Sequence, residues 1–254
     1  MIDERIAERR AEVRGERRRI RLRRTLVLVL VAIVVAGLVA VERSALVGLE
    51  EVRVHGVHRL ETAAVLDAAD LELGTSTLRL GLGDAAERVT ALPLVREANA
   101  SRMDPLTVQI EVVEREPVLN VTGAGVTRLV DRDGILIADG AVEGLAEIRL
   151  DAEPPAVGQG VGADPALANA HLAWRGLGGP LRTEVARLDA EGPEELTLQL
   201  ERGLEVRFGR AQRLDEKVRA LGAILGDIDS ETGDAGGVAT IDVRAPAAPV
   251  VVGR

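Results

Sequence analysis

An uncharged apolar run near the N-terminus constrains this chain more than any other feature. Residues Thr25 to Val41 read TLVLVLVAIVVAGLVAV and contain no charged side chain. As a helix rising about 1.5 Å per residue, this run would extend roughly 25 Å, close to the lower limit for crossing the hydrocarbon core of a bilayer. The flanking Arg23, Arg24 and Arg43 have long side chains that can reach the headgroups. The run therefore predicts a transmembrane helix at 25–41.

Two other interpretations fit the run less well. A cleaved signal peptide has a short basic leader, an apolar stretch of about 7–15 residues and small residues at the cleavage site. Here the leader is 24 residues long, and Val39-Ala40-Val41 is a poor cleavage site. A buried helix of a globular domain is also disfavoured, because a run this apolar and unbroken is unusual in a domain of this size.

The distribution of charge predicts the orientation of the segment. Residues 1–24 hold ten Arg and five acidic side chains, a net charge of +5; the whole chain carries −9, so residues 25–254 carry −14. Basic flanks of a membrane helix stay in the cytoplasm. We therefore expect a cytoplasmic basic tail at 1–24 and a single-pass (type II) protein whose C-terminal part lies outside the membrane. The basic tail is interpreted as a signal for membrane topology. The alternative is that it docks cytoplasmic partners.

Composition excludes several functions for the outer part. The chain has no Cys, one Trp, one Phe and no Tyr, which removes thiol catalysis, cysteine-based metal sites and disulfide stabilisation. An acidic surface with so few aromatic rings is also unsuited to nucleic acid, which requires basic and stacking groups. Apolar content of 46% still supports folded domains, and the lack of Cys favours a bacterial envelope.

The pattern of residues after the anchor predicts an α+β fold in two domains. At 49–117 we expect a strand at 51–56, helices at 62–69 and 85–92 with Asp84 as N-cap of the second, and strands at 94–102 and 106–112. At 118–245 we expect a mainly antiparallel β domain with flanking helices. Its expected elements are a hairpin of 126–130 and 135–138, a strand at 145–150, a helix at 166–177 capped by Asp164, strands at 185–189, 196–200 and 204–208, a helix at 214–225, a polar loop at 226–237 and a last strand at 238–243. Residues 246–254 are expected to be a C-terminal tail.

An ordered set of motifs resembles one family. The first domain has Val52-x-Val54-x-Gly56, Gly74-x-x-x-Leu78, Leu92-Pro93-x-Val95, Arg102-x-x-Pro105 and Glu114-Arg115-x-Pro117. The second has Leu129-Val-Asp131-x-x-Gly134, Gly203-Leu-Glu-Val-Arg-Phe-Gly209 followed by Lys217, and Ile241-Asp242-Val243-Arg244-x-Pro246. Together they resemble the POTRA domain and the C-terminal β domain of the bacterial cell-division family FtsQ/DivIB. Residues 139–182 fit loosely, and aromatics often seen near the last strands of the family are absent.

This resemblance implies a function without catalysis. Members of the family are single-pass scaffolds of the divisome in the cell membrane at the division septum. They bind FtsB-like and FtsL-like proteins outside the membrane and link early and late division proteins to the control of septal peptidoglycan synthesis. Two alternatives are a POTRA-containing protein of outer-membrane assembly or secretion, and a membrane-anchored regulator of a cell-wall enzyme. The first should carry repeated POTRA units or a barrel, and neither pattern is evident at 118–254.

The sequence offers no set of residues for a reaction, a cofactor or a metal. The three histidines, His55, His58 and His171, do not share a helix face, and a metal site needs three or four converging ligands. The acidic clusters at 131–133 and 227–231 lack the full calcium-loop pattern and are interpreted as turn chemistry. No Gly-x-Ser-x-Gly or Ser-x-x-Lys motif occurs.

The predicted partner-binding site is therefore the last expected strand. If this strand lies at a sheet edge, its free backbone groups can pair with a strand of the partner, and alternate side chains provide selectivity. The expected partner-binding residues are Val238, Ala239, Thr240, Ile241, Asp242, Val243 and Arg244, together with Lys217. A plain terminal strand that serves only stability is the alternative, and the POTRA-like domain is a second candidate surface.

Overall fold

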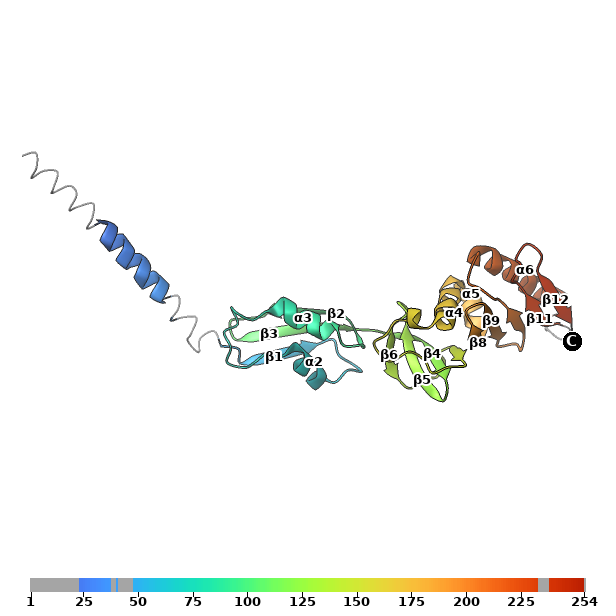
Figure 1. Cartoon of the computed structure of the whole chain (residues 1–254), viewed down its shortest axis with the longest axis horizontal. Coiled ribbons are helices and arrows are strands. Elements are labelled where there is room, and N and C mark those ends of the chain that lie inside the picture. Colours follow the sequence, from blue (N-terminus) through green and yellow to red (C-terminus); the bar gives the residue numbers. More distant parts are fainter. Residues whose placement is uncertain (1–22, 38–39, 41–47, 233–237, 254) are drawn as a thin grey trace, which may run out of the picture. The chain divides into compact units, whose positions relative to one another are not determined.

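The computed structural model describes residues 23–37, 40, 48–232 and 238–253 (Figure 1). Its described chain divides into two compact units, and each is described by itself. The first unit takes in the described chain up to residue 55 together with 62–87 and 99–111. The second takes in 56–61, 88–98 and the described chain from 112 onward. One three-stranded and one nine-stranded sheet with separate helices make the fold α+β, as expected.

A helix occupies residues 23–37 and overlaps the segment predicted to cross the membrane at 25–41 (Figure 1). Residues 38, 39 and 41 of that segment, like the basic tail up to residue 22, lie outside the described residues. Within the described ranges, no helix combines the length and the apolarity required of a candidate membrane span.

The three-stranded sheet follows the expected order of strand, helix, helix, strand, strand. Its elements are β1 (Glu51–His55), α2 (Thr62–Ala69), α3 (Leu82–Thr90), β2 (Val95–Arg102) and β3 (Thr107–Glu114). Strand β3 lies in the centre and pairs in parallel with β1, so that Val54 lies opposite Ile110. Helix α3 begins at Leu82, so Asp84 lies within its first turn and is not its N-cap. There the carboxylate still faces the positive end of the helix dipole.

The nine-stranded sheet has the order β12-β11-β10-β9-β8-β7-β4-β5-β6. Its strands are β4 (Pro117–Gly123), β5 (Val126–Asp131), β6 (Leu136–Asp139), β7 (Glu147–Leu150), β8 (Val185–Gly192), β9 (Glu195–Leu200), β10 (Glu205–Arg207), β11 (Val238–Asp242) and β12 (Val250–Gly253). Pairs β4–β7, β7–β8 and β10–β11 are parallel, and the other neighbours are antiparallel. The mainly antiparallel sheet agrees with the expectation.

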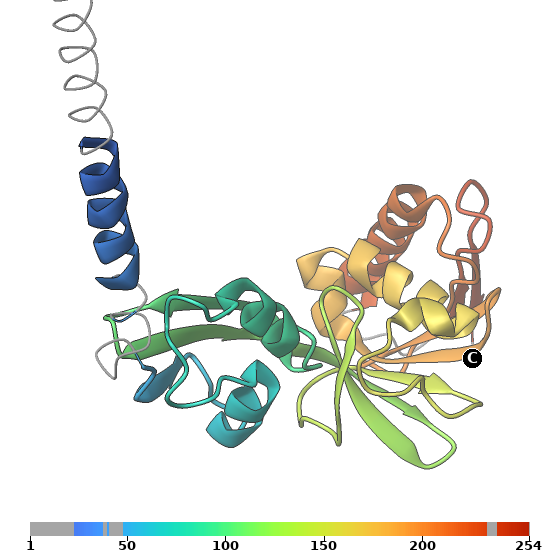
Figure 2. The ribbon, with the colours of Figure 1, turned by 60° about the vertical axis from the view of Figure 1, so that its left-hand side comes forward.

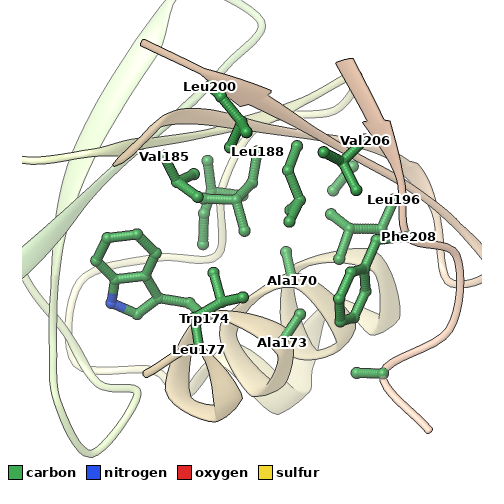
Figure 3. Close-up of a cluster of buried hydrophobic side chains, with 14 of the residues drawn as sticks. Ala170, Ala173, Trp174, Leu177, Val185, Leu188, Leu196, Leu200, Val206 and Phe208 are labelled. Atoms are coloured by element: carbon green, nitrogen blue, oxygen red, sulfur yellow. The ribbon is translucent and has the colours of Figure 1, made fainter. Parts of the chain in front are cut away.

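Helices cover one face of this sheet (Figure 2). They are α4 (Pro165–Gly176), α5 (Gly179–Glu184) and α6 (Leu214–Thr232), preceded by a short 3-10 turn, η2 (Val161–Ala163). Helix α4 starts where expected: the side chain of Asp164 accepts a hydrogen bond from the Leu167 N–H at 2.8 Å, and Pro165 occupies the first turn. Figure 3 shows side chains of α4 meeting those of β8, β9 and β10, with Trp174 and Phe208 at opposite sides of the cluster.

Two elements of the second unit were not expected from the sequence. Strand β4 buries Leu119 and Val121 in strict alternation, but no turn signal separates it from β3, which ends only a few residues earlier. Helix α5 is a single short stretch of six residues, too short for a periodic pattern to be recognised.

The end of the chain differs most from the expectation. Helix α6 continues to Thr232, so residues 226–232 are not part of a loop; Ile228 extends the buried face that contains Leu221 and Leu225. Residues 233–237 of the expected loop lie outside the described residues. The expected tail at 246–254 contains β12, which adds a strand to the sheet beyond β11.

Candidate partner-binding edge of the large sheet

The predicted binding strand, residues 238–244, coincides with β11, but it does not form the edge of the sheet. Strand β11 pairs in parallel with β10 on one side and antiparallel with β12 on the other, where Ile241 lies opposite Val251. The prediction of a free edge at 238–244 is therefore wrong. The physical reason is that the chain turns after Pro246 and returns as a β-branched strand that uses the backbone groups of β11.

Burial divides the predicted residues into two groups. Ile241 and Val243 are fully buried in the core, whereas Thr240, Asp242 and Ala239 are half-buried. These three residues are not equivalent, since Thr240 and Asp242 share one face of the strand and Ala239 lies on the other. Val238 pairs with Gly253 through the backbone. Among residues 239–244, Arg244, which follows the strand, is the one exposed residue.

Arg244 is held by the strand that it follows. Its guanidinium forms an ion pair with Asp242, with 2.5 Å between Nη2 and Oδ2, and its backbone N–H donates to Oδ1 of the same carboxylate at 3.0 Å. The side-chain hydrogen bond from Arg244 lowers the pKa of the Asp242 carboxyl. This pair links Arg244 to Asp242, the last residue of β11, and so fixes the Arg244 side chain at the end of the strand.

Strand β12 forms the outer edge of the described sheet. Its three valines are all open to solvent, with Val250 55%, Val251 46% and Val252 51% exposed. A row of exposed β-branched residues on an edge strand is a template for pairing with another chain. The run of valines after Pro249 is a strand signal, and the expectation of a tail at 246–254 is wrong there.

The ladder on β11 determines which backbone groups of β12 face outward. The N–H of Val243 donates to the carbonyl of Arg207 at 3.0 Å, so the odd-numbered residues of β11 turn their backbone groups toward β10. Thr240 and Asp242 then face β12, opposite Val252 and Val250. Because bonded and non-bonded positions alternate along an antiparallel pair, the N–H and carbonyl of Val251 point away from β11.

Lys217, the other predicted site residue, is buried on α6. Its side chain is 3% exposed, and its ammonium donates to the carbonyls of Phe208 and Arg210 at 2.6 and 2.7 Å. Burial lowers the pKa of Lys217, and the charge of Arg213 lowers it further. Lys217 is therefore placed to hold the segment after β10.

The other titratable candidates lie in a turn, on a strand and on a helix. The side chain of Asp131 accepts hydrogen bonds from the backbone N–H groups of Asp133 and Ile135 at 3.0 and 2.8 Å, which is the turn chemistry expected of that cluster. His55 lies on β1, and His171 is buried on α4. In the part of the chain that the structure describes, no three acidic or histidine side chains converge as a metal site would require.

Comparison with known proteins matches two stretches of the chain to family models. Residues 47–115 match the FtsQ-type POTRA domain, and residues 120–244 match the C-terminal domain of the cell-division protein FtsQ/DivIB. The two matches follow each other in the chain in the order that the motifs indicated.

Relatives named "Cell division protein FtsQ" agree with these matches. The one from Mycobacteroides abscessus is 30% identical over 81% of this chain and 62% of its own length. Those from Mycobacterium leprae and Streptomyces bingchenggensis are 30% and 28% identical over 81% and 82% of this chain, and over 56% and 77% of their own lengths. The chain spans about three fifths of the length of the mycobacterial relatives. On the two ordered matches and these relatives, the chain belongs to the FtsQ/DivIB family of bacterial cell-division proteins.

Proposed function

We propose that this protein is a non-enzymatic, single-pass membrane scaffold of the bacterial divisome. It binds FtsB-like and FtsL-like proteins outside the membrane and links early to late division proteins, which bears on septal peptidoglycan synthesis. Membership of a cell-division family supports the divisome role. The arrangement of the large sheet supports the mode of binding: its outer strand is short, apolar and exposed, and it pairs with one neighbour only in the described chain.

Strand addition at β12 is the proposed mechanism. The partner contributes an extended segment that pairs with the outward backbone groups of β12, and the alternating valines contact alternate side chains of that segment. The valines fall on two faces, since Val250 and Val252 lie beside Asp242 and Thr240, whereas Val251 lies beside Ile241.

Residues 238–244 keep a role in this proposal as the strand that holds β12. Backbone pairing from Val238 to Asp242 fixes the register of β12, and Arg244 closes the end of β11. Lys217 supports β11 indirectly, because it holds the segment that precedes α6. The boundaries at 49–117 and 118–245 are proposed as those of the POTRA and β domains.

A backbone substitution at Val251 tests strand addition. Val251→Pro removes an N–H that faces away from β11, and proline is tolerated where an edge strand faces solvent. We expect this variant to lose co-purification of the FtsB-like partner while β11 keeps its protection from hydrogen exchange. Val251→Thr, which keeps the N–H and the β-branched shape, is the matched control and should bind. Val252→Pro should loosen β12 itself, because the backbone of Val252 faces β11.

If the partner co-purifies unchanged with the Val251→Pro protein, the proposal of strand addition at β12 is wrong. Substitutions in β11 or directly after it are less informative, since Ile241 and Val243 are fully buried and proline there would damage the core.

The membrane topology is proposed from the apolar run and its basic flank. A span at 25–41 places the tail at 1–24 in the cytoplasm and both sheets outside. The chain lacks cysteine, so single cysteines report topology without background. A membrane-impermeant maleimide added to intact spheroplasts should label Ser101→Cys and not Ala7→Cys, and both should react after lysis. Labelling of Ala7→Cys in intact cells would reverse the proposed orientation.

A further inference from the structure

Two adjoining cavities open beside α4 in the second unit. Neither is lined by residues of β11 or β12. Their volumes are about 380 and 670 Å³, and they share Val118, Trp174 and Arg182 as lining residues. The smaller cavity is also lined by His171, Arg175, Arg132 and Asp133. No motif in the sequence pointed to this place.

A buried histidine with an unused nitrogen lines the smaller cavity. His171 is 4% exposed, and its Nε2 has no hydrogen-bond partner in the structure. Its ring hydrogen-bonds to the backbone of Asp131, and because Nε2 is free this bond uses Nδ1. Burial lowers the pKa of His171, and the charge of Arg175 adds to the effect. A neutral ring that donates through Nδ1 leaves Nε2 as an acceptor, and a buried acceptor without a donor is costly.

The tryptophan beside it is the only one in the chain. Trp174 is 8% exposed, and the guanidinium of Arg182 lies over its ring at 5.3 Å from the centroid. One Nη of Arg182 donates to the carbonyls of Arg175 and Leu177 at the end of α4, at 3.2 and 2.9 Å. Its Nε is buried and has no partner. The cavity therefore has an aromatic wall, one unused donor and one unused acceptor.

The rim of this cavity is basic in a chain that is acidic overall. Three guanidinium groups, those of Arg132, Arg175 and Arg182, face one carboxylate, that of Asp133. Neither Arg175 nor Arg182 forms an ion pair within the described ranges, and Arg132 approaches Asp133 only at 4.0 Å. Local positive charge on a protein of net charge −9 selects for a negatively charged partner.

We propose that these cavities bind an acidic peptide segment of a protein partner. A carboxylate of the segment pairs with the guanidinium groups of Arg175 and Arg182, an N–H or O–H of the segment donates to Nε2 of His171, and its apolar atoms contact Trp174. This site is independent of strand addition at β12, so the two can fail separately.

The single tryptophan provides the readout. The probes are two acetylated and amidated hexapeptide mixtures, one with Asp-Glu fixed at the centre and one with the neutral isosteres Asn-Gln. With the full chain in detergent, we expect the Asp-Glu mixture to shift the Trp174 emission, and we expect this shift to saturate as the peptide concentration rises. The Asn-Gln mixture should bind about tenfold more weakly or not at all, as expected when charge provides selectivity.

Matched arginine variants locate the site. Arg175→Gln should weaken binding of the Asp-Glu mixture by roughly tenfold. Arg149→Gln, on the exposed face of β7 and outside both cavities, should leave binding unchanged. His171→Phe removes the Nε2 acceptor and also the Nδ1 hydrogen bond to the backbone of Asp131; it should weaken binding while the far-UV spectrum stays native. Val251→Pro, which tests strand addition, should bind the mixture normally.

The proposal would be overturned by no saturable shift with the Asp-Glu mixture, by an equal shift with the Asn-Gln mixture, or by equal binding by the Arg175→Gln and Arg149→Gln proteins. Acetate and inorganic phosphate are tested alone. If either reproduces the whole shift at the peptide concentration, the site binds small anions and the peptide assignment fails.

Discussion

The ammonium of Lys217 lies 2.6 Å from the carbonyl oxygen of Phe208 and 4.8 Å from the centre of the Phe208 ring. It also donates to the carbonyl of Arg210 at 2.7 Å. The segment that it grips is tied to β9 as well, since the N–H groups of Phe208 and Gly209 both donate to the carbonyl of Leu196 at 2.9 Å. Lys217 thus joins α6 to the strands that support β11.

Lys217→Met should therefore destabilise the large sheet. The substitution keeps most of the apolar stem but leaves two carbonyls without their donor, at a cost of about 2–4 kcal/mol. Urea unfolding of the full chain in detergent measures the loss, and hydrogen exchange should place it at β10 and β11. Arg219→Met on the exposed side of the same helix is the control and should change stability by about 0.5 kcal/mol or less. Equal effects of the two changes would refute the role given to Lys217.

Stability should also rise with pH in the alkaline range. Burial lowers the pKa of Lys217 in the folded chain, whereas the unfolded value is about 10.4. Between these two values the unfolded chain binds a proton that the folded chain does not, so the free energy of unfolding increases with pH. The chain has no Tyr and no Cys, and Lys217 is its one lysine, so no other side chain titrates there. Urea unfolding from about pH 8.5 to 11 measures the slope, which Lys217→Met should abolish; a downward slope in the unaltered protein would contradict the sign.

The sequence predicted where the helices and strands lie better than it predicted which strands pair with one another. The Gly and Pro signals and the alternating valines located β1, α2, β2 and β3, because each of these signals acts locally. The alternation of β11 was also found. Whether β11 is an edge strand depends on what pairs beyond Asp242, and alternation is the same for an edge strand and an inner one.

The remaining misses have equally specific causes. The acidic residues at 227–231 resembled a loop, but Ile228 continues the buried face of α6 through them. The cavity beside α4 could not be predicted, since Arg132 after β5 lies far in the sequence from His171 and Trp174 on α4 and from Arg182 on α5, and only the folded chain brings them together. The burial of Lys217 was hidden for the same reason.

Asp131→Ala should destabilise the hairpin of β5 and β6. The buried carboxylate accepts two backbone N–H groups of the turn and pairs with Arg115 at 2.6 Å. Its loss leaves both N–H groups unpaired, at about 2–3 kcal/mol, and also removes the partner of Arg115. Asp133→Ala removes an exposed carboxylate from the same turn and is the control. Hydrogen exchange at Ile135 and its neighbours reads the effect locally. Should the Asp133 variant loosen the turn as much as the Asp131 variant, the assignment to buried hydrogen bonds would be wrong.

Two glycines allow a matched test of close packing in the three-stranded sheet. Gly56 and Gly74 have nearly the same backbone angle, φ +85° and +84°, in the left-handed region that disfavours other residues. A Cβ at Gly56 would collide with the backbone carbonyl of Val112, whereas a Cβ at Gly74 would meet nothing within 4 Å.

Gly74→Ala should therefore cost only the backbone term, about 1 kcal/mol. Gly56→Ala adds a collision with a strand that cannot move without breaking its ladder, so we expect a loss of roughly 3 kcal/mol or more. Hydrogen exchange of β1 and β3 in the full chain measures both, with β8 and β9 as the internal reference that should not change. Because φ is matched, the difference between the two variants isolates the contact with Val112, and equal protection factors in β1 for both would show that this contact contributes nothing.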